Sequence, residues 1–130
     1  MENTHNPLVS YELASKINDL LTYSWPVEYM INSEGKVIAE NLVTQDRAEW
    51  LPCPSLDMAV RFLIEEIGII VEPIYEYFLE KIHRQWRYRV IWFGDNYPTV
   101  YGPCLESRDA AISEGIRKAL EQIEYERNRD

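Results

Sequence analysis

The chain has 130 residues, enough for one domain with its own hydrophobic core, so neither a metal nor a disulfide is needed for folding. Hydrophobic residues make up 46% of the chain and charged residues 27%, a balance typical of globular proteins. The 13 Lys and Arg against 22 Asp and Glu give a net charge of −9. This charge disfavours DNA, RNA and anionic membranes as extended partners because all three are polyanions. It does not exclude one small anion held by a few local arginines.

The N-terminus and the two cysteines both favour a cytoplasmic protein. Residues 1–13 contain no basic region that leads into an apolar run, so we expect no signal peptide. No apolar stretch approaches the ~18 residues of a membrane span. Cys53 and Cys104 are 51 residues apart in proline-rich segments. A disulfide between them is one alternative, and we favour two free thiols.

The first elements along the chain are a predicted helix and a predicted hairpin. Asn6 and Pro7 fit the N-cap and the first position of a helix, and apolar side chains at helical spacing extend it over residues 7–22. Two β-branched or apolar runs, residues 27–31 and 36–43, flank the sequence Asn-Ser-Glu-Gly. That arrangement predicts a β-hairpin.

Two further helices are predicted from serine caps. The polar and then proline-rich stretch 44–54 is expected to be a loop. Ser55 and Ser107 each precede an amphipathic stretch with Asp in its first turn, which predicts a capped helix start. The first of these helices should end at Gly68 in the left-handed conformation. The second should run close to the C-terminus, where residues 125–130 are charged and expected to fray.

The region between these two helices contains a strand and an ambiguous segment. In residues 73–85 the apolar side chains fit a helical stripe, although Tyr75 and Tyr77 also alternate as in a strand. We favour a short helix there. Residues 86–93 predict a strand, with a turn at 94–96 and a returning partner strand at 98–101.

This order of elements predicts an α+β fold. We expect an antiparallel sheet of two hairpins packed by three to four helices, in an α-β-α sandwich-like arrangement. The whole chain, residues 1–130, is expected to form a single domain with a core over about residues 8–123.

One segment of the acidic chain is basic. Residues 81–89 carry four positive charges and no acid. If this segment is a strand, Arg87 and Arg89 point to one face while Trp86 and Tyr88 point to the other. Arginine beside aromatic rings suits a nucleotide-like anion, because it offers bidentate contacts to phosphate next to a flat surface for the base. From the residues alone we favour the other interpretation, a solvated face that offsets neighbouring glutamates.

Arg108 is the second candidate for anion binding. It lies in the first turn of the last predicted helix, where unpaired N–H groups and the helix dipole favour a phosphate. Asp109 opposes this because its carboxylate competes for the same donors. From the residues alone we favour the other interpretation, an ordinary capped helix start.

Signatures of catalysis and of metal binding are missing from the sequence. His5 and His83 have no Cys or His at ligand spacing, so we expect no metal. There is no glycine-rich phosphate loop and no nucleophile elbow. We therefore expect a protein that is not an enzyme and needs no cofactor. The 4 tryptophans and 9 tyrosines exceed what one small core holds, which favours self-association as a homodimer or higher oligomer.

The layout resembles the phage ABA sandwich family, small proteins of bacteriophages and prophages. The resemblance covers about residues 8–123, with residues 72–84 as an insertion relative to the commoner members. It rests on four stretches of sequence: ELASKINDLL, WLPCPSLDMAVRFLIEEIG, WRYRVIWF and ESRDAAISEGIRKALEQI.

One branch of that family is similar to the Thoeris anti-defence sponges. These phage proteins bind cyclised ADP-ribose signals, and in some cases cyclic oligonucleotides, without degrading them. The resemblance implies an arginine for the phosphates, an aromatic platform, and an amide or carboxylate for the base or ribose. By position it assigns phosphate contact to Arg108, stacking to Phe93 and hydrogen bonding to Asn96. Arg87 and Arg89, with Asp109, complete the candidate set from this sequence itself.

The leading hypothesis is therefore a phage or prophage protein of the host cytoplasm that sequesters such a nucleotide-derived immune signal. The alternative is a protein-interaction module without a small-molecule ligand, whose acidic surface steers it to a basic host protein or into phage assembly. A hydrolase of such signals is the third and weakest hypothesis, because no metal set or nucleophile pair is visible.

Overall fold

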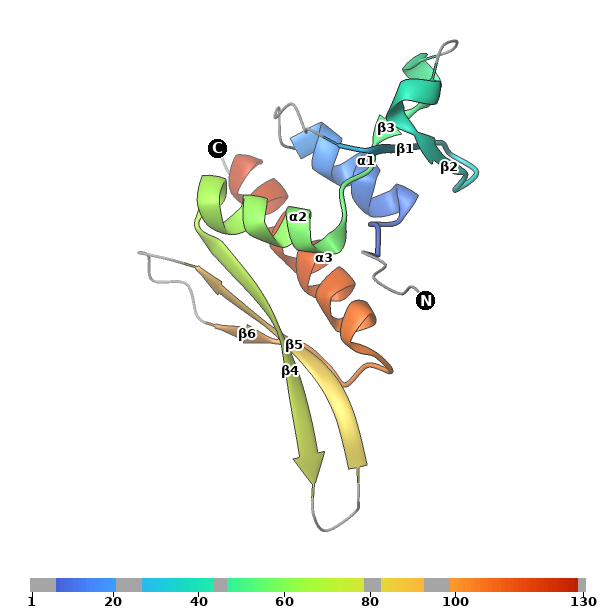
Figure 1. The fold of residues 1–130 in the computed structure, drawn as a ribbon. Helices are drawn as coiled ribbons and strands as arrows, with labels where there is room; N and C mark the ends of the chain where they lie inside the picture. Colours follow the sequence, from blue (N-terminus) through green and yellow to red (C-terminus); the bar gives the residue numbers. More distant parts are fainter. Residues whose placement is uncertain (1–6, 21–26, 44–46, 79–82, 93–98, 129–130) are drawn as a thin grey trace. The chain divides into compact units, whose positions relative to one another are not determined.

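The computed structural model describes residues 7–20, 27–43, 47–78, 83–92 and 99–128. The chain divides into two compact units, Met1–Met58 (unit 1) and Ala59–Asp130 (unit 2). Figure 1 shows helices together with two antiparallel three-stranded sheets, so the predicted α+β class is confirmed. The strands form two sheets rather than one. The expectation of a single domain stays a prediction, and each unit is described by itself below.

Unit 1 contains a small sheet in the order β2-β1-β3. The strands β1 (Tyr29–Ile31) and β2 (Val37–Ala39) form the predicted hairpin. In its turn the Oδ1 atom of Asn32 accepts hydrogen bonds from the N–H groups of Glu34 and Lys36, each at 3.0 Å. Short 3-10 turns follow at Glu40–Leu42 and Arg47–Glu49.

The third strand of this sheet corrects the predicted loop at 44–54. Within that stretch, β3 (Leu51–Pro52) pairs antiparallel with β1. Pro52 is tolerated because β3 is an edge strand, where a missing N–H removes no internal ladder bond. Proline-rich composition predicts a loop when the segment is considered alone. That Leu51 and Pro52 form an edge strand depends on their pairing with β1, 20 residues or more earlier in the chain.

The helix α1 (Tyr11–Leu20) starts later than predicted. Pro7 is not helical, because residues 7–9 run alongside residues 54–56: the N–H of Val9 donates to the carbonyl of Pro54, and that of Leu56 donates to the carbonyl of Pro7. Ser10 is the residue that caps the helix, since its Oγ accepts from the N–H of Leu13 at 3.2 Å. Asn6 and the predicted end near residue 22 lie outside the described residues.

The helix α2 (Leu56–Phe62) confirms the prediction from Ser55, whose Oγ accepts from the N–H of Met58 at 3.1 Å. It continues as a π-helical turn, Leu63–Ile67, and ends at Gly68. Gly68 has φ 89° and ψ 29°, the left-handed C-cap expected there.

Unit 2 contains β4 (Ile69–Phe78), β5 (His83–Trp92), β6 (Val100–Tyr101) and the helix α3 (Arg108–Arg127). The sheet order is β4-β5-β6, and both pairings are antiparallel. The predicted strand at 86–93 and its returning partner at 98–101 are confirmed in β5 and β6, except that residues 93 and 98 lie outside the described residues. The predicted turn at 94–96 lies outside the described residues.

The helix predicted within residues 73–85 is wrong. Residues 73–78 belong to β4, which pairs with β5 in unbroken register from Ile69 opposite Trp92 to Phe78 opposite His83. Cross-strand pairs along this ladder outweigh a local helical stripe, because each pair adds hydrogen bonds and side-chain contacts that an isolated helical turn lacks. The strand pattern of Tyr75 and Tyr77 was the correct signal.

The helix α3 packs on one face of this sheet, here called the inner face. A Cβ placed on Gly115 of α3 would press on Cγ1 of Val71 and touch Tyr88, so helix and sheet are in close contact there. Val71, Tyr88 and Val90 are buried on this face. Tyr88 therefore faces the core between the sheet and α3. By strand alternation, Arg87 and Arg89 lie on the opposite, outer face.

Candidate functional site

The start of α3 is held next to the strand β5 by backbone hydrogen bonds. After β6, the N–H of Leu105 donates to the carbonyl of Trp86 at 2.6 Å, and the N–H of Trp86 donates back at 3.4 Å. Two residues later, Ser107 caps α3 by accepting from the N–H of Ala110 at 3.0 Å. Leu105 is therefore the residue paired with Trp86, and Arg108, the first residue of α3, lies only three positions after it.

An aromatic pair lies on the same face of the sheet as α3. Tyr75 of β4 is opposite Trp86 of β5, with ring centroids 4.9 Å apart and an interplanar angle of 55°. Both residues share the inner face with Tyr88 by alternation. Tyr75 is 48% exposed, so the pair offers an accessible aromatic surface. We refer to Tyr75, Trp86, Ser107 and Arg108 as the helix-start site.

The charge at the helix-start site is only weakly compensated. Arg108 Nη1 lies 4.0 Å from Asp109 Oδ1, and the two side chains are 53% and 55% exposed. An exposed ion pair at that distance contributes little, because water screens it. The N–H groups of Arg108 and Asp109 open a helix of 20 residues and have no partner inside the helix. Guanidinium, N–H groups and helix dipole all favour an anion here, while the Asp109 carboxylate opposes one.

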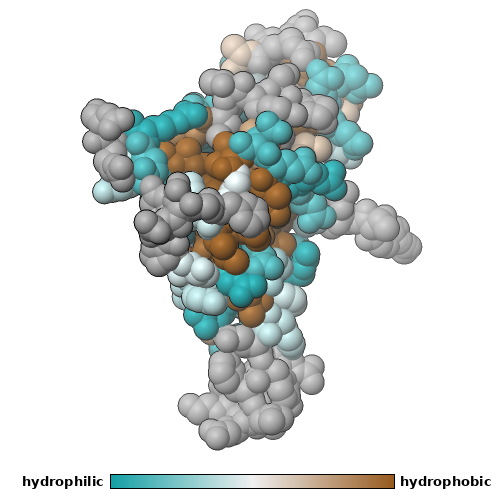
Figure 2. Space-filling model, turned by 90° about the vertical axis from the view of Figure 1, so that its left-hand side faces the viewer, coloured by the Kyte–Doolittle hydropathy of each residue, from teal (hydrophilic) through white to brown (hydrophobic). Residues whose placement is uncertain are grey.

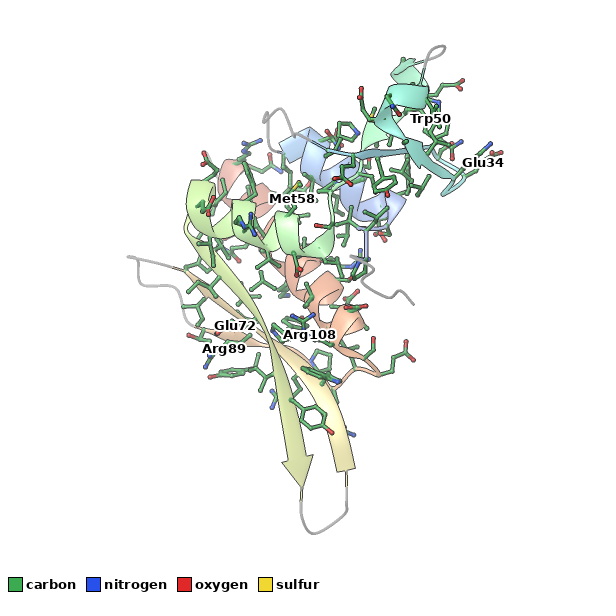
Figure 3. The ribbon with its side chains drawn as sticks, in the orientation of Figure 1. Glu34, Trp50, Met58, Glu72, Arg89 and Arg108 are labelled. Atoms are coloured by element: carbon green, nitrogen blue, oxygen red, sulfur yellow. The ribbon has the colours of Figure 1, made fainter. Side chains whose placement is uncertain are left out.

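The arginines of the outer face have closer partners. Arg89 donates two hydrogen bonds to Glu72 Oε1, from Nε at 2.9 Å and from Nη2 (Figure 3). The hydrogen bond to Glu72, followed by one to Tyr101, raises the pKa of Arg89 above its usual value. Arg87 Nε donates to the carbonyl of Gly102 at 2.9 Å, and its guanidinium lies 5.6 Å from the ring centroid of Tyr101. The two arginines are thus integrated into the sheet surface.

The ligand-binding residues predicted from the sequence do not lie together in the structure. Arg108 and Asp109 lie at the start of α3, which packs on the inner face, whereas Arg87 and Arg89 lie on the outer face. Phe93 and Asn96 lie outside the described residues. Sequence reasoning missed the Tyr75–Trp86 pair because it placed Tyr75 in a helix.

Two cavities in unit 1 are lined by other residues. One of about 360 Å³ lies among Tyr11, Asn32, Glu34, Glu49 and Leu51, and carries two carboxylates. A smaller one, of about 150 Å³, is lined partly by Cys53.

Both cysteines are free thiols, as the sequence favoured. Cys53 is buried and donates weakly to the carbonyl of Val9, with the sulfur 3.4 Å away. Burial raises the pKa of the Cys53 thiol to about 11. Cys104 is exposed.

Within the described part of the chain, no group of three or more His, Cys, Asp or Glu side chains is placed to hold a metal ion. No helix among the described residues has the length and apolar character needed to cross a membrane. No known protein family, no curated protein and no solved structure matches the chain. Function is therefore inferred from the residues at the start of α3 and from the charge of each unit.

Proposed function

We propose that this protein binds and sequesters, without chemical change, a small phosphorylated nucleotide-derived molecule of the cyclised ADP-ribose class. The helix-start site is the place of binding. The observation that carries the proposal is the Tyr75–Trp86 ring pair, of which Tyr75 is exposed, on the face of the sheet that is packed by α3, the 20-residue helix that Arg108 opens. The resemblance to the phage sponges supports the ligand class and a role against bacterial defence in the host cytoplasm.

The chemistry of the site suits both halves of such a ligand. A base stacked on the ring pair contributes about 1–3 kcal/mol. Each charge-assisted hydrogen bond from Arg108 to a phosphate oxygen contributes about 1.5–3 kcal/mol. Arg108 is better placed for this than Arg89, because its carboxylate neighbour is 4.0 Å away while Arg89 already donates two hydrogen bonds to Glu72.

Uptake and release of intact ligand test the proposed activity. The purified protein is incubated with cyclised ADP-ribose isomers and with cyclic di- and trinucleotides, freed of unbound ligand and heated, and the supernatant is analysed by mass spectrometry. Recovery of unchanged ligand is expected. Recovery of a modified product would identify an enzyme, and absence of uptake would contradict binding of this ligand class.

Two substitutions test the place of binding. Arg108→Ala should weaken ligand binding at least about tenfold and Tyr75→Ala at least about fivefold, as the loss of one charge-assisted hydrogen bond and of one stacking contact predicts. Arg127→Ala, at the opposite end of the same helix, is the matched control and should bind like the unaltered protein. Arg87→Ala separates the two faces. If Arg87→Ala abolishes binding while Arg108→Ala does not, the ligand binds on the outer face instead.

The second candidate function is a protein-interaction module. It is favoured by the charge of unit 1, which carries 9 acidic and only 3 basic residues. Such a surface attracts a basic protein partner. A pull-down from host lysate, eluted with increasing salt, tests this function. A specific basic protein should be retained at low salt and released as salt rises, and retention of no protein would contradict it.

A further inference from the structure

The outer face of the β4–β5–β6 sheet carries two matched columns of side chains. On β4 the column is Ile70, Glu72 and Ile74, and on β5 the register partners of these residues are Ile91, Arg89 and Arg87. All six residues are half-buried. The helix α3 packs on the inner face and not on the face that carries these columns (Figure 1). Figure 2 views the side on which Glu72 and Arg89 are drawn in Figure 3, and hydrophobic surface gathers there beside hydrophilic surface.

The local charge of this face differs from that of the whole chain. The net charge of −9 makes two copies repel each other. Among the outer-face residues whose side chains are described, Arg87 and Arg89 accompany the single acid Glu72. A second copy approaching this face therefore does not meet the acidic excess found elsewhere.

The columns are also self-complementary under two-fold symmetry. Consider two copies stacked face to face about a two-fold axis that runs parallel to the strands, between β4 and β5. Each β4 residue then lies opposite its own register partner in the second copy, with the two sheets aligned. Glu72 faces Arg89 of the second copy, and Ile70 faces Ile91 of the second copy. Each of these two contacts occurs twice in the interface, and Ile74 lies opposite Arg87 of the second copy.

We infer that the outer face of this sheet is the surface through which the chain forms a homodimer. The isoleucines form the apolar part of the interface. Glu72 and Arg89 hydrogen-bond within one chain and gain a second oppositely charged neighbour across the two-fold axis. Tyr101, which is 53% exposed on the short strand β6, is the register partner of Arg89 at the edge of these columns, and aromatic residues are enriched at interfaces. The inference does not depend on the proposed ligand, because the helix-start site lies on the inner side of the sheet.

Charge reversal distinguishes a contact between copies from a contact within one chain. Glu72→Arg and Arg89→Glu each place like charges opposite one another in a homodimer, so each variant alone should be monomeric. When the two variants are mixed, position 72 of one faces an opposite charge at position 89 of the other, in both halves of the interface. The mixture should therefore form a heterodimer, which sedimentation equilibrium and native mass spectrometry would detect. A purely intramolecular role of the pair cannot produce association on mixing.

Two further samples complete the experiment. Glu66→Arg makes the same change of net charge as Glu72→Arg at an exposed position outside the face and should dimerise like the unaltered chain. Circular dichroism of each variant checks that the fold is retained. If a charge-reversal variant does not fold, Ile91→Asp is used in its place and should be monomeric. A monomeric unaltered chain at every concentration, or variants that fold yet remain monomeric on mixing, would overturn the inference.

Discussion

At the scale of single residues, Gly102 shows how closely the sheet of unit 2 is packed. A Cβ at this position would overlap the ring of Tyr88, which is buried. The backbone of Gly102 is also used twice, because its N–H donates to the carbonyl of Tyr88 and its carbonyl accepts from Arg87 Nε. Glycine is therefore required here for space, and the same residue connects the inner face to the outer face.

Gly102→Ala should lower the free energy of unfolding by about 1–3 kcal/mol, because the added methyl group forces the buried ring to shift. Denaturant unfolding of the purified variant measures this. In a Tyr88→Ala background the same substitution should cost much less, since the ring that it meets is gone. An equal cost in both backgrounds would show that the ring is not the cause.

The buried thiol of Cys53 should make the stability of the fold depend on pH in the alkaline range. Because the folded-state pKa of Cys53 is raised to about 11 from an ordinary 9.0, the folded state keeps its thiol proton where the unfolded chain loses it. The contribution of Cys53 to stability is therefore complete below about pH 9 and declines as pH rises towards 11. Burial raises the pKa of Tyr88 as well, which adds in the same direction.

Unfolding measured between neutral pH and pH 11 tests this effect. Cys53→Ala should lose stability less steeply with pH than the unaltered chain, and Tyr88 should account for part of the slope that remains. In the folded protein a thiol reagent should modify Cys104 quickly and Cys53 only on unfolding. Identical slopes for Cys53→Ala and the unaltered chain would contradict the assignment to Cys53.

At the scale of elements, the end of α2 is set by neighbouring residues, whereas the strand β4 depends on a segment further along the chain. Gly68 ends the π-helical turn by adopting φ 89° and donating its N–H to the carbonyl of Leu63 at 2.8 Å. Both features follow from neighbouring residues, and the sequence predicted the left-handed end at Gly68. The strand β4 that follows depends on β5, and the sequence favoured a helix for part of it.

Gly68→Ala should cost about 1 kcal/mol of stability, because side chains with a Cβ are disfavoured in the left-handed region. Gly68→Asn should cost less, since Asn tolerates this conformation better than Ala. Thermal unfolding of both variants compares the two costs. Equal losses for Ala and Asn would argue against backbone conformation as the reason for glycine here.

At the scale of the whole molecule, the net negative charge of each copy opposes the proposed dimer, and salt should weaken this repulsion by screening it. Unit 1 has a net charge of −6 and unit 2 of −3, from 9 acidic and 3 basic residues in the first and 13 acidic and 10 basic in the second. Two charges of −9 about 30 Å apart repel by about 10 kcal/mol in unscreened water. Each exposed ion pair across the interface contributes at most about 1 kcal/mol.

Dimerisation should therefore strengthen as ionic strength rises from about 0.01 M to 0.15 M, where the screening length falls from about 30 Å to 8 Å. Sedimentation equilibrium over about a hundredfold range of protein concentration measures the dissociation constant at each salt concentration. Weaker association with added salt would mean that the ion pairs dominate over the net charge.

The sequence by itself determined the α+β class, the serine-capped starts of α2 and α3, the end of α2 at Gly68 and the strand that contains Arg87 and Arg89. Each of these rests on neighbouring residues, whose capping, backbone conformation and alternation act within one or two turns. Only the tertiary structure decided that residues 69–78 form a strand and that Pro52 lies in an edge strand. It also placed the helix that Arg108 opens on one face of the sheet and Arg89 on the other. These outcomes depend on pairing between segments far apart in the chain, where register and packing, and not local preference, set which side chains meet.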